Sequence, residues 1–124
     1  NASGMSGGKR VGLNLGAKWT DNTGMTENAI VVDGKLTKIS ENVSFKYDVK
    51  NIMQPWIIKS CVTDCIDLVF TPFYERVAKT NALIIKSDMH QMMGHFTGNI
   101  KTEDGEVISI DNLAGCAEEH FAKW

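Results

Sequence analysis

The sequence is poor in proline and cysteine, has no long hydrophobic run and carries little net charge. It contains two prolines and three cysteines in 124 residues. No stretch approaches the roughly 18 consecutive apolar residues that a membrane-spanning helix needs. Lys and Arg number 13 against 15 Asp and Glu, which gives a formal net charge of −2. These features predict no membrane span and no nucleic-acid partner, because the chain has no excess positive charge to attract polyanions.

The cysteines do not fit the disulfide framework of a small secreted protein. Cys61, Cys65 and Cys116 are an odd number. Cys61 and Cys65 bracket residues 62–64, which are typical of a hairpin loop, so their thiols could lie close enough to oxidise. The alternative is two small, half-buried side chains that stay reduced. We expect reduced thiols and a cytoplasmic location.

Motifs of common cofactor and metal sites are also absent. No Gly-rich phosphate loop, Gly-x-Ser-x-Gly or His-Glu-x-x-His pattern occurs. No second pair of Cys or His stands at the spacing of zinc ligands. We therefore expect neither a metal nor a cofactor.

The first residues differ in composition from the rest. Residues 1–9 are rich in Gly and Ser, lack the apolar segment of a signal peptide, and do not begin with Met. We interpret them as a cloning remnant and flexible lead-in. Residues 10–124 are then a single β-barrel-like domain, which we expect to be the C-terminal half of a longer protein.

Strand patterns dominate the chain. Apolar and polar residues alternate with a period of two, and Asp33-Gly34 and Asp104-Gly105 are strong turn signals. Gly94 and Gly98 lie where a strongly bent strand would have them. The predicted strands include residues 11–15, 29–32, 35–39, 43–47, 56–60, 66–70, 73–78, 83–101 and 107–110.

The last segment has a different spacing. Asp111 or Asn112 could cap a helix, in which Leu113, Cys116 or Ala117, His120 and Trp124 recur at helical spacing. About nine strands with one short C-terminal helix predict an all-β fold, an antiparallel meander that forms a barrel or half-barrel.

Two clusters of titratable residues are candidate catalytic groups. Glu75-Arg76 follows a predicted kink at Pro72 and is either an exposed ion pair or a charge fork at the mouth of a barrel. Glu118-Glu119-His120 is either a cluster at the end of the barrel or a base with its orienting partner, in which Glu119 and His120 are the candidates.

Histidine and the large side chains give further candidates. His90 and His95 are five residues apart, which places them on opposite faces of a strand, and His90 could act as an acid or base. Met92 beside it is either core filling or part of an adaptable pocket. Trp19, Trp56 and Tyr74 are candidate ligand-binding residues, because large amphipathic rings often line cavities.

Several short strings occur in a fixed order along the chain. They are residues 12–16, 19–29, 32–35, 55–56, 67–76, 91–94, 96–98 and 117–120, followed by Trp124. This ordered set resembles the C-terminal half of a bacterial domain-of-unknown-function family, number two thousand eight hundred and four, from about Arg10 to Trp124. The resemblance implies a lipocalin-like β-barrel of the two-barrel kind, a group that includes carotenoid hydratases and tocopherol cyclases.

Three functions remain open on the sequence alone. The first is a lipocalin-like module that binds a hydrophobic small molecule such as an isoprenoid or fatty acyl group. The second is a hydratase, cyclase or isomerase in which Glu75 or Glu119 and a histidine protonate a double bond. The third is a structural role beside the missing N-terminal half. An excised half could also form a homodimer through an exposed sheet edge.

Overall fold

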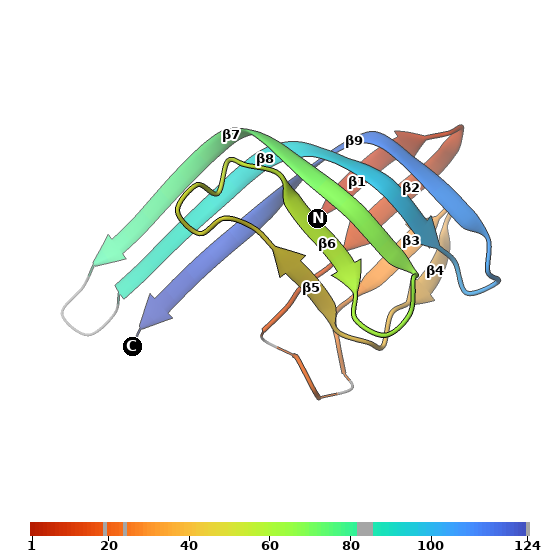
Figure 1. Cartoon of the computed structure of the whole chain (residues 1–124), viewed down its shortest axis with the longest axis horizontal. Coiled ribbons are helices and arrows are strands. Elements are labelled where there is room, and N and C mark those ends of the chain that lie inside the picture. The colour runs from red at the N-terminus through yellow and green to blue at the C-terminus, as the bar shows by residue number, and fades with distance from the viewer. Residues whose placement is uncertain (19, 24, 82–85, 124) are drawn as a thin grey trace.

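The protein is one antiparallel sheet of nine strands (Figure 1). The structure is a computed structural model that describes residues 1–18, 20–23, 25–81 and 86–123. The sheet order is β4-β3-β2-β1-β9-β8-β7-β6-β5. The strands are β1 (Ala2–Ser6), β2 (Lys9–Asn14), β3 (Ala29–Val32), β4 (Lys35–Lys38), β5 (Val43–Lys46), β6 (Trp56–Ser60), β7 (Ile66–Asn81), β8 (Lys86–Lys101) and β9 (Val107–Lys123).

The sheet is curled but not closed into a barrel. Its edge strands, β4 and β5, do not pair with each other within the described part of the chain. The segment between them, residues 39–42, connects the two ends of the sheet. Ile39 donates its backbone N–H to the Asn28 carbonyl before β3, and the Asn42 carbonyl accepts the backbone N–H of Cys61 after β6. The expected barrel is thus a strongly curved open sheet, which forms an arch in Figure 1.

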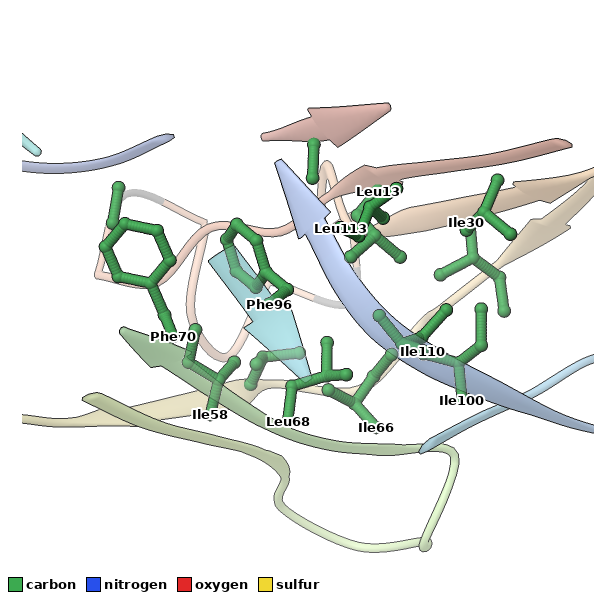
Figure 2. Packing of buried hydrophobic residues seen from close by; sticks show 14 of the residues in the cluster. Leu13, Ile30, Ile58, Ile66, Leu68, Phe70, Phe96, Ile100, Ile110 and Leu113 are labelled. Carbon is green, nitrogen blue, oxygen red and sulfur yellow. The ribbon is translucent and has the colours of Figure 1, made fainter. Parts of the chain in front are cut away.

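The inner face of the curl carries the core. Alternate residues of each strand point inward, as the period of two requires. The cluster in Figure 2 joins Leu13 and Ile30 from one side of the sheet with Phe70, Phe96 and others from the opposite side. The fully buried side chains include Trp56, Phe70, Ile58, Ile66, Leu68, Met92, Ile100 and Ile110.

The predicted C-terminal helix is wrong. Residues 107–123 form β9, which pairs with β8 along its length. Leu113 and Ala117 are buried four residues apart, and a spacing of four places two residues on one face of a strand as well as of a helix. Asn112, expected near a helix cap, has φ 54° where the register with β8 shifts. No helix occurs in the described residues, and none could therefore span a membrane there.

The interpretation of residues 1–9 as a flexible lead-in is also corrected. Ala2–Ser6 form β1, which pairs with β2 along its length and meets β9 at the Ala2–Gly115 pair. Ser6 is buried, accepts a hydrogen bond from the Asp111 amide and donates one to the Ser109 carbonyl. The first strand therefore lies beside the last and joins the two halves of the sheet.

Several local predictions are confirmed. The strand predicted at residues 29–32 is β3, and Asp33 and Gly34 both have positive φ, at 50° and 81°, as a two-residue hairpin of this kind requires. Residues 61–65 form the loop between β6 and β7. None of the three cysteines is paired in a disulfide.

The long strands β7, β8 and β9 continue past the rest of the sheet and form what we call the three-stranded arm, residues 74–81, 86–93 and 116–123 (Figure 1). A register shift between Pro72 and Tyr74 makes Phe73 an extra residue in β7. An extra residue reverses which side chains face inward. This bulge decides the face on which each candidate catalytic residue of β7 lies.

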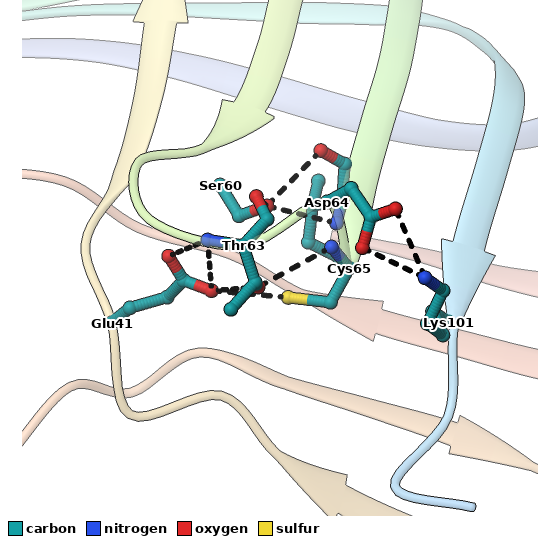
Figure 3. A network of polar contacts seen from close by, with 7 residues as sticks. Glu41, Ser60, Thr63, Asp64, Cys65 and Lys101 are labelled. Atoms are coloured by element: carbon teal, nitrogen blue, oxygen red, sulfur yellow. Dashed lines mark hydrogen bonds and ion pairs between the residues drawn. The ribbon is translucent and has the colours of Figure 1, made fainter. Parts of the chain in front are cut away.

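A polar network fixes the loop between β6 and β7 (Figure 3). The Glu41 carboxylate accepts hydrogen bonds from the amides of Val62 and Thr63, from the Thr63 hydroxyl and from the Cys65 thiol. Burial raises the pKa of Glu41, but these hydrogen bonds outweigh it and hold the pKa below its usual value.

We expect Glu41→Gln to cost about 1 kcal/mol of the free energy of unfolding at pH 7, after allowing for solvent screening. A lowered carboxyl pKa stabilises the fold above the unfolded-state value and loses its effect as pH falls through the folded-state value. The difference between the variant and the parent should therefore begin to shrink near the unfolded-state pKa of about 4.3 and be lost as pH falls through the lower folded-state pKa. Urea unfolding from pH 3 to 7 measures it. Glu103→Gln, on an exposed turn, is the control. An equal loss of stability in this variant would contradict the stabilising role of the Glu41 carboxylate.

Candidate functional site

A cavity of about 660 Å³ lies inside the curl, and we call it the inner cavity. It is bounded by the end of β2 and the loop after it, by β5, by Trp56 of β6, and by β8 and β9. Its apolar wall includes Leu13, Phe45, Trp56, Phe96 and Ala117. Its polar residues include Lys18, Asp21, Glu27, Tyr47 and Glu119.

Aromatic rings make the wall rigid. Tyr47 stacks on Trp56 with ring centroids 4.0 Å apart, and Trp56 meets Phe70 edge-on at 6.3 Å. Phe70 in turn packs against Phe96 at 4.7 Å. The Trp56 indole N–H donates to the Ile52 carbonyl at 2.8 Å, which satisfies the polar group of a side chain that is only 1% exposed. The predicted ligand-binding residue Trp56 therefore forms part of the cavity wall.

Glu119 brings together three segments that are distant in sequence. The Tyr47 hydroxyl, just after β5, donates a hydrogen bond to Glu119 Oε2 on β9. The Lys18 ammonium, after β2, lies 3.7 Å from Glu119 Oε1. Burial, together with the hydrogen bond and charge of Glu119, raises the pKa of Tyr47 to about 12. Tyr47 therefore stays protonated and holds the carboxylate beside the aromatic stack.

A second polar group occupies the inner face of the arm. His90 Nδ1 lies 2.7 Å from Glu75 Oε1, and His90 Nε2 lies 3.1 Å from Asp88 Oδ1. Each of these side chains is about 30% exposed. The structure thus brings the predicted residues Glu75 and His90 into contact, but neither lines the inner cavity.

The other two predicted catalytic residues face the opposite way. Arg76 follows Glu75 in β7 and pairs with Gln91 of β8. Because neighbouring residues of a strand point to opposite faces, Arg76 lies on the outer face of the arm. His120 is one position beyond Glu119 on β9, and its Nε2 lies 3.0 Å from the Ser87 hydroxyl. His120 is also among the residues around the inner cavity. Arg76 therefore does not share a cavity with Glu75 and His90.

The remaining predicted ligand-binding residues are dispersed. Tyr74 is 57% exposed and lines a second, more open pocket on the outer face with Phe73, Met93 and Cys116. Met92 is fully buried in the core. Trp19 lies outside the described residues, as does Trp124 of the expected helix.

Sequence reasoning did not select Tyr47, Lys18 or Phe96 for the site. A signal for Tyr47 existed, because Val43, Phe45 and Tyr47 alternate with polar residues and so share a face. Lys18 has no such signal, since it lies in a loop whose path depends on the folded sheet. His90 and His95 do lie on opposite faces of β8, and the His95 ring is 5.2 Å from Phe73 on the outer face.

The arrangement is suited to holding an apolar body against aromatic rings, with a polar group beside Glu119. Among the described residues, no group of three or more His, Cys, Asp or Glu side chains is placed to hold a metal ion.

Comparison with known proteins identifies the family of this chain but no individual relative. The model of the family described as "Domain of unknown function (DUF2804)" matches residues 1–124, including β1. No curated protein and no solved structure gives a significant match. The chain belongs to the DUF2804 family.

Proposed function

We propose that the inner cavity binds a hydrophobic small molecule. The observation that carries the proposal is the rigid aromatic wall, Tyr47 on Trp56 and Phe70 on Phe96, next to a cavity of about 660 Å³. Ligand pockets are commonly about 300–1,000 Å³, mostly apolar, and have a few placed polar groups. The aromatic wall supplies the apolar surface, and Tyr47 and Glu119 are the polar groups of the lining that lie next to it.

Filling the cavity tests this proposal. Ala117 is 7% exposed and lines the inner cavity, so Ala117→Phe should occupy ligand space. We expect its Kd for the neutral probe 1-dodecanol, measured by native mass spectrometry or calorimetry, to rise by about tenfold or more. Thermal unfolding checks that the variant folds.

Ala114→Phe is the matched control, because Ala114 is exposed and lies on the outer face of the same strand. It should leave the Kd near that of the parent protein. Parent protein that binds no probe, or a folded Ala117→Phe variant that binds as well as the parent, would refute the proposal. Native mass spectrometry of protein purified from cells should also show a retained apolar ligand.

The enzymatic alternative has weaker support. A hydratase, cyclase or isomerase needs its acid, its imidazole and its substrate in one cavity. Glu75 and His90 touch each other but lie outside the inner cavity, and Arg76 is on the outer face. Glu119 and His120 both border the inner cavity, but Glu119 contacts Tyr47 and Lys18, whereas His120 contacts Ser87. The binding role requires no such constellation, so it remains our proposal.

The lipocalin-like relationship belongs to the same proposal. A curled antiparallel meander around a cavity, with β5 and β4 as open edges, is consistent with part of a barrel of that kind. Three unbridged thiols are consistent with a cytoplasmic location.

A structural role as one half of a two-barrel protein is favoured by the arm. β6 pairs with β7 only as far as Phe70, and β1 reaches β9 only at Gly115, so both outer edges of the arm lack a neighbouring strand among the described residues. Exposed strand edges pair readily with another strand. Such a partner would be the other half or a second copy, and light scattering at increasing concentration distinguishes a monomer from a dimer.

A further inference from the structure

The charges around the inner cavity are unevenly distributed. The described residues that line it include four carboxylates, against one lysine, Lys18, and the N-terminal ammonium of Asn1, which donates to the Cys116 carbonyl at 2.9 Å. The Lys18 side chain is 75% exposed, and its ammonium contacts Glu119 at 3.7 Å. A pair this exposed is weak, because water and salt screen it and a long side chain must be held in place. Lys18 can therefore yield its position to another cation. The four carboxylates are those of Asp21, Glu27, Glu118 and Glu119.

Glu119 differs from the other acids because its position is fixed. Tyr47 donates a hydrogen bond to it and at the same time stacks on Trp56 at 4.0 Å. The carboxylate is thereby held where the aromatic wall ends. A carboxylate next to aromatic rings suits an ammonium group, which gains both an ion pair and attraction to the ring electrons.

We propose that the inner cavity selects amphiphiles with a cationic, amine-type head group, and that Glu119 is the residue that determines this selectivity. The apolar chain of the ligand lies against Phe96, Phe45 and Leu13, and its ammonium replaces that of Lys18 at Glu119. A carboxylate head of the same chain length is disfavoured, because it meets Glu119 and the other acids. This inference rests on the proposed function, since it concerns the same cavity.

The test compares three ligands that differ only in the head group. Dodecylamine, 1-dodecanol and dodecanoate, each below its micelle concentration at pH 7, are titrated into the full chain by calorimetry. We expect dodecylamine to bind about tenfold more tightly than dodecanoate, with 1-dodecanol between them. The preference should weaken as salt concentration rises.

Two charge-removing variants should then act in opposite directions. Glu119→Gln should reduce the preference for dodecylamine by about fivefold or more, whereas Lys18→Gln should increase it. Dodecanol affinity should change little in either variant. Glu103→Gln, on the exposed β8–β9 turn away from the cavity, should leave all three affinities unchanged.

The outcomes distinguish the ligand-binding function from the preference for a cationic head group. Failure of all three ligands to bind would refute both the ligand-binding function and this inference. Binding of dodecanol with dodecanoate equal to or tighter than dodecylamine would overturn the inference and leave the ligand-binding function standing. A loss of dodecanoate binding in Lys18→Gln, without a gain for dodecylamine, would show that Lys18 receives an anionic head and would also overturn it.

Discussion

Phe70→Ala is expected to lower the free energy of unfolding by about 3–5 kcal/mol. Phe70 is fully buried and contacts both Trp56 and Phe96, so its removal leaves a cavity between two aromatic rings. Domains of this size are stabilised by only about 5–15 kcal/mol, and the loss is therefore a large fraction of the total. Urea unfolding followed by tryptophan fluorescence measures it.

Phe73→Ala is the matched control for this prediction. It removes the same side chain three residues along the same strand, but Phe73 is 62% exposed on the outer face. We expect it to cost less than about 1 kcal/mol. Equal losses in the two variants would mean that the curl of the sheet does not bury Phe70 as described.

Gly98→Ala is expected to destabilise the protein by about 3 kcal/mol or more. Gly98 has φ 141°, a conformation that residues with a Cβ atom rarely adopt. A Cβ atom there would also overlap the backbone carbonyl of Asp67 and approach Leu68 Cα to 3.0 Å. These are backbone atoms of the neighbouring strand, so neither strain nor overlap is relieved by a side-chain rotation.

Gly12→Ala, the same chemical change in β2, is the control. A Cβ atom at Gly12 would meet only Val31 Cβ at 3.7 Å, an ordinary van der Waals contact. Its stability should stay within about 0.5 kcal/mol of the parent protein. Denaturation of both variants under identical conditions gives the comparison, and a mild effect of Gly98→Ala would contradict the described strand path.

The sequence allowed prediction of those strands whose side chains alternate clearly. β3 and the Asp33-Gly34 hairpin follow from local pattern and turn chemistry alone. β1 could not be predicted in this way, because Ala2 and Ser6 are small and carry little hydrophobic signal. That strand forms because β2 and β9 supply backbone partners on both sides of it, which is a tertiary effect.

The predicted helix failed for a related reason. Spacings of three and four residues among Leu113, Ala117 and His120 suggested a helix, but pairing along β8 outweighs that local preference. The kink predicted at Pro72 corresponds to the bulge at Phe73, through which β7 continues as one strand.

The candidate site could be predicted only in part. Glu75 and His90 were both predicted as candidates and are in contact, but that contact depends on the Phe73 bulge. Without this extra residue, Glu75 would face outward and Arg76 inward. Pro72 marks an irregularity in the strand, but it does not specify the register that follows. Tyr47 and Glu119, 72 residues apart, meet only because the sheet curls.

The position of β1 beside β9 has a consequence for how the chain is made. A ribosome produces β1 to β4 first, whereas the Ser6–Ser109 and Asn1–Cys116 contacts span 103 and 115 residues. Strands β1 to β4 therefore lack these partners, with Leu13 and Ile30 still uncovered, until the residues of β9 have emerged. Closing contacts over such separations is slow. Nascent chains of this protein should consequently bind chaperones that recognise exposed apolar strands during translation.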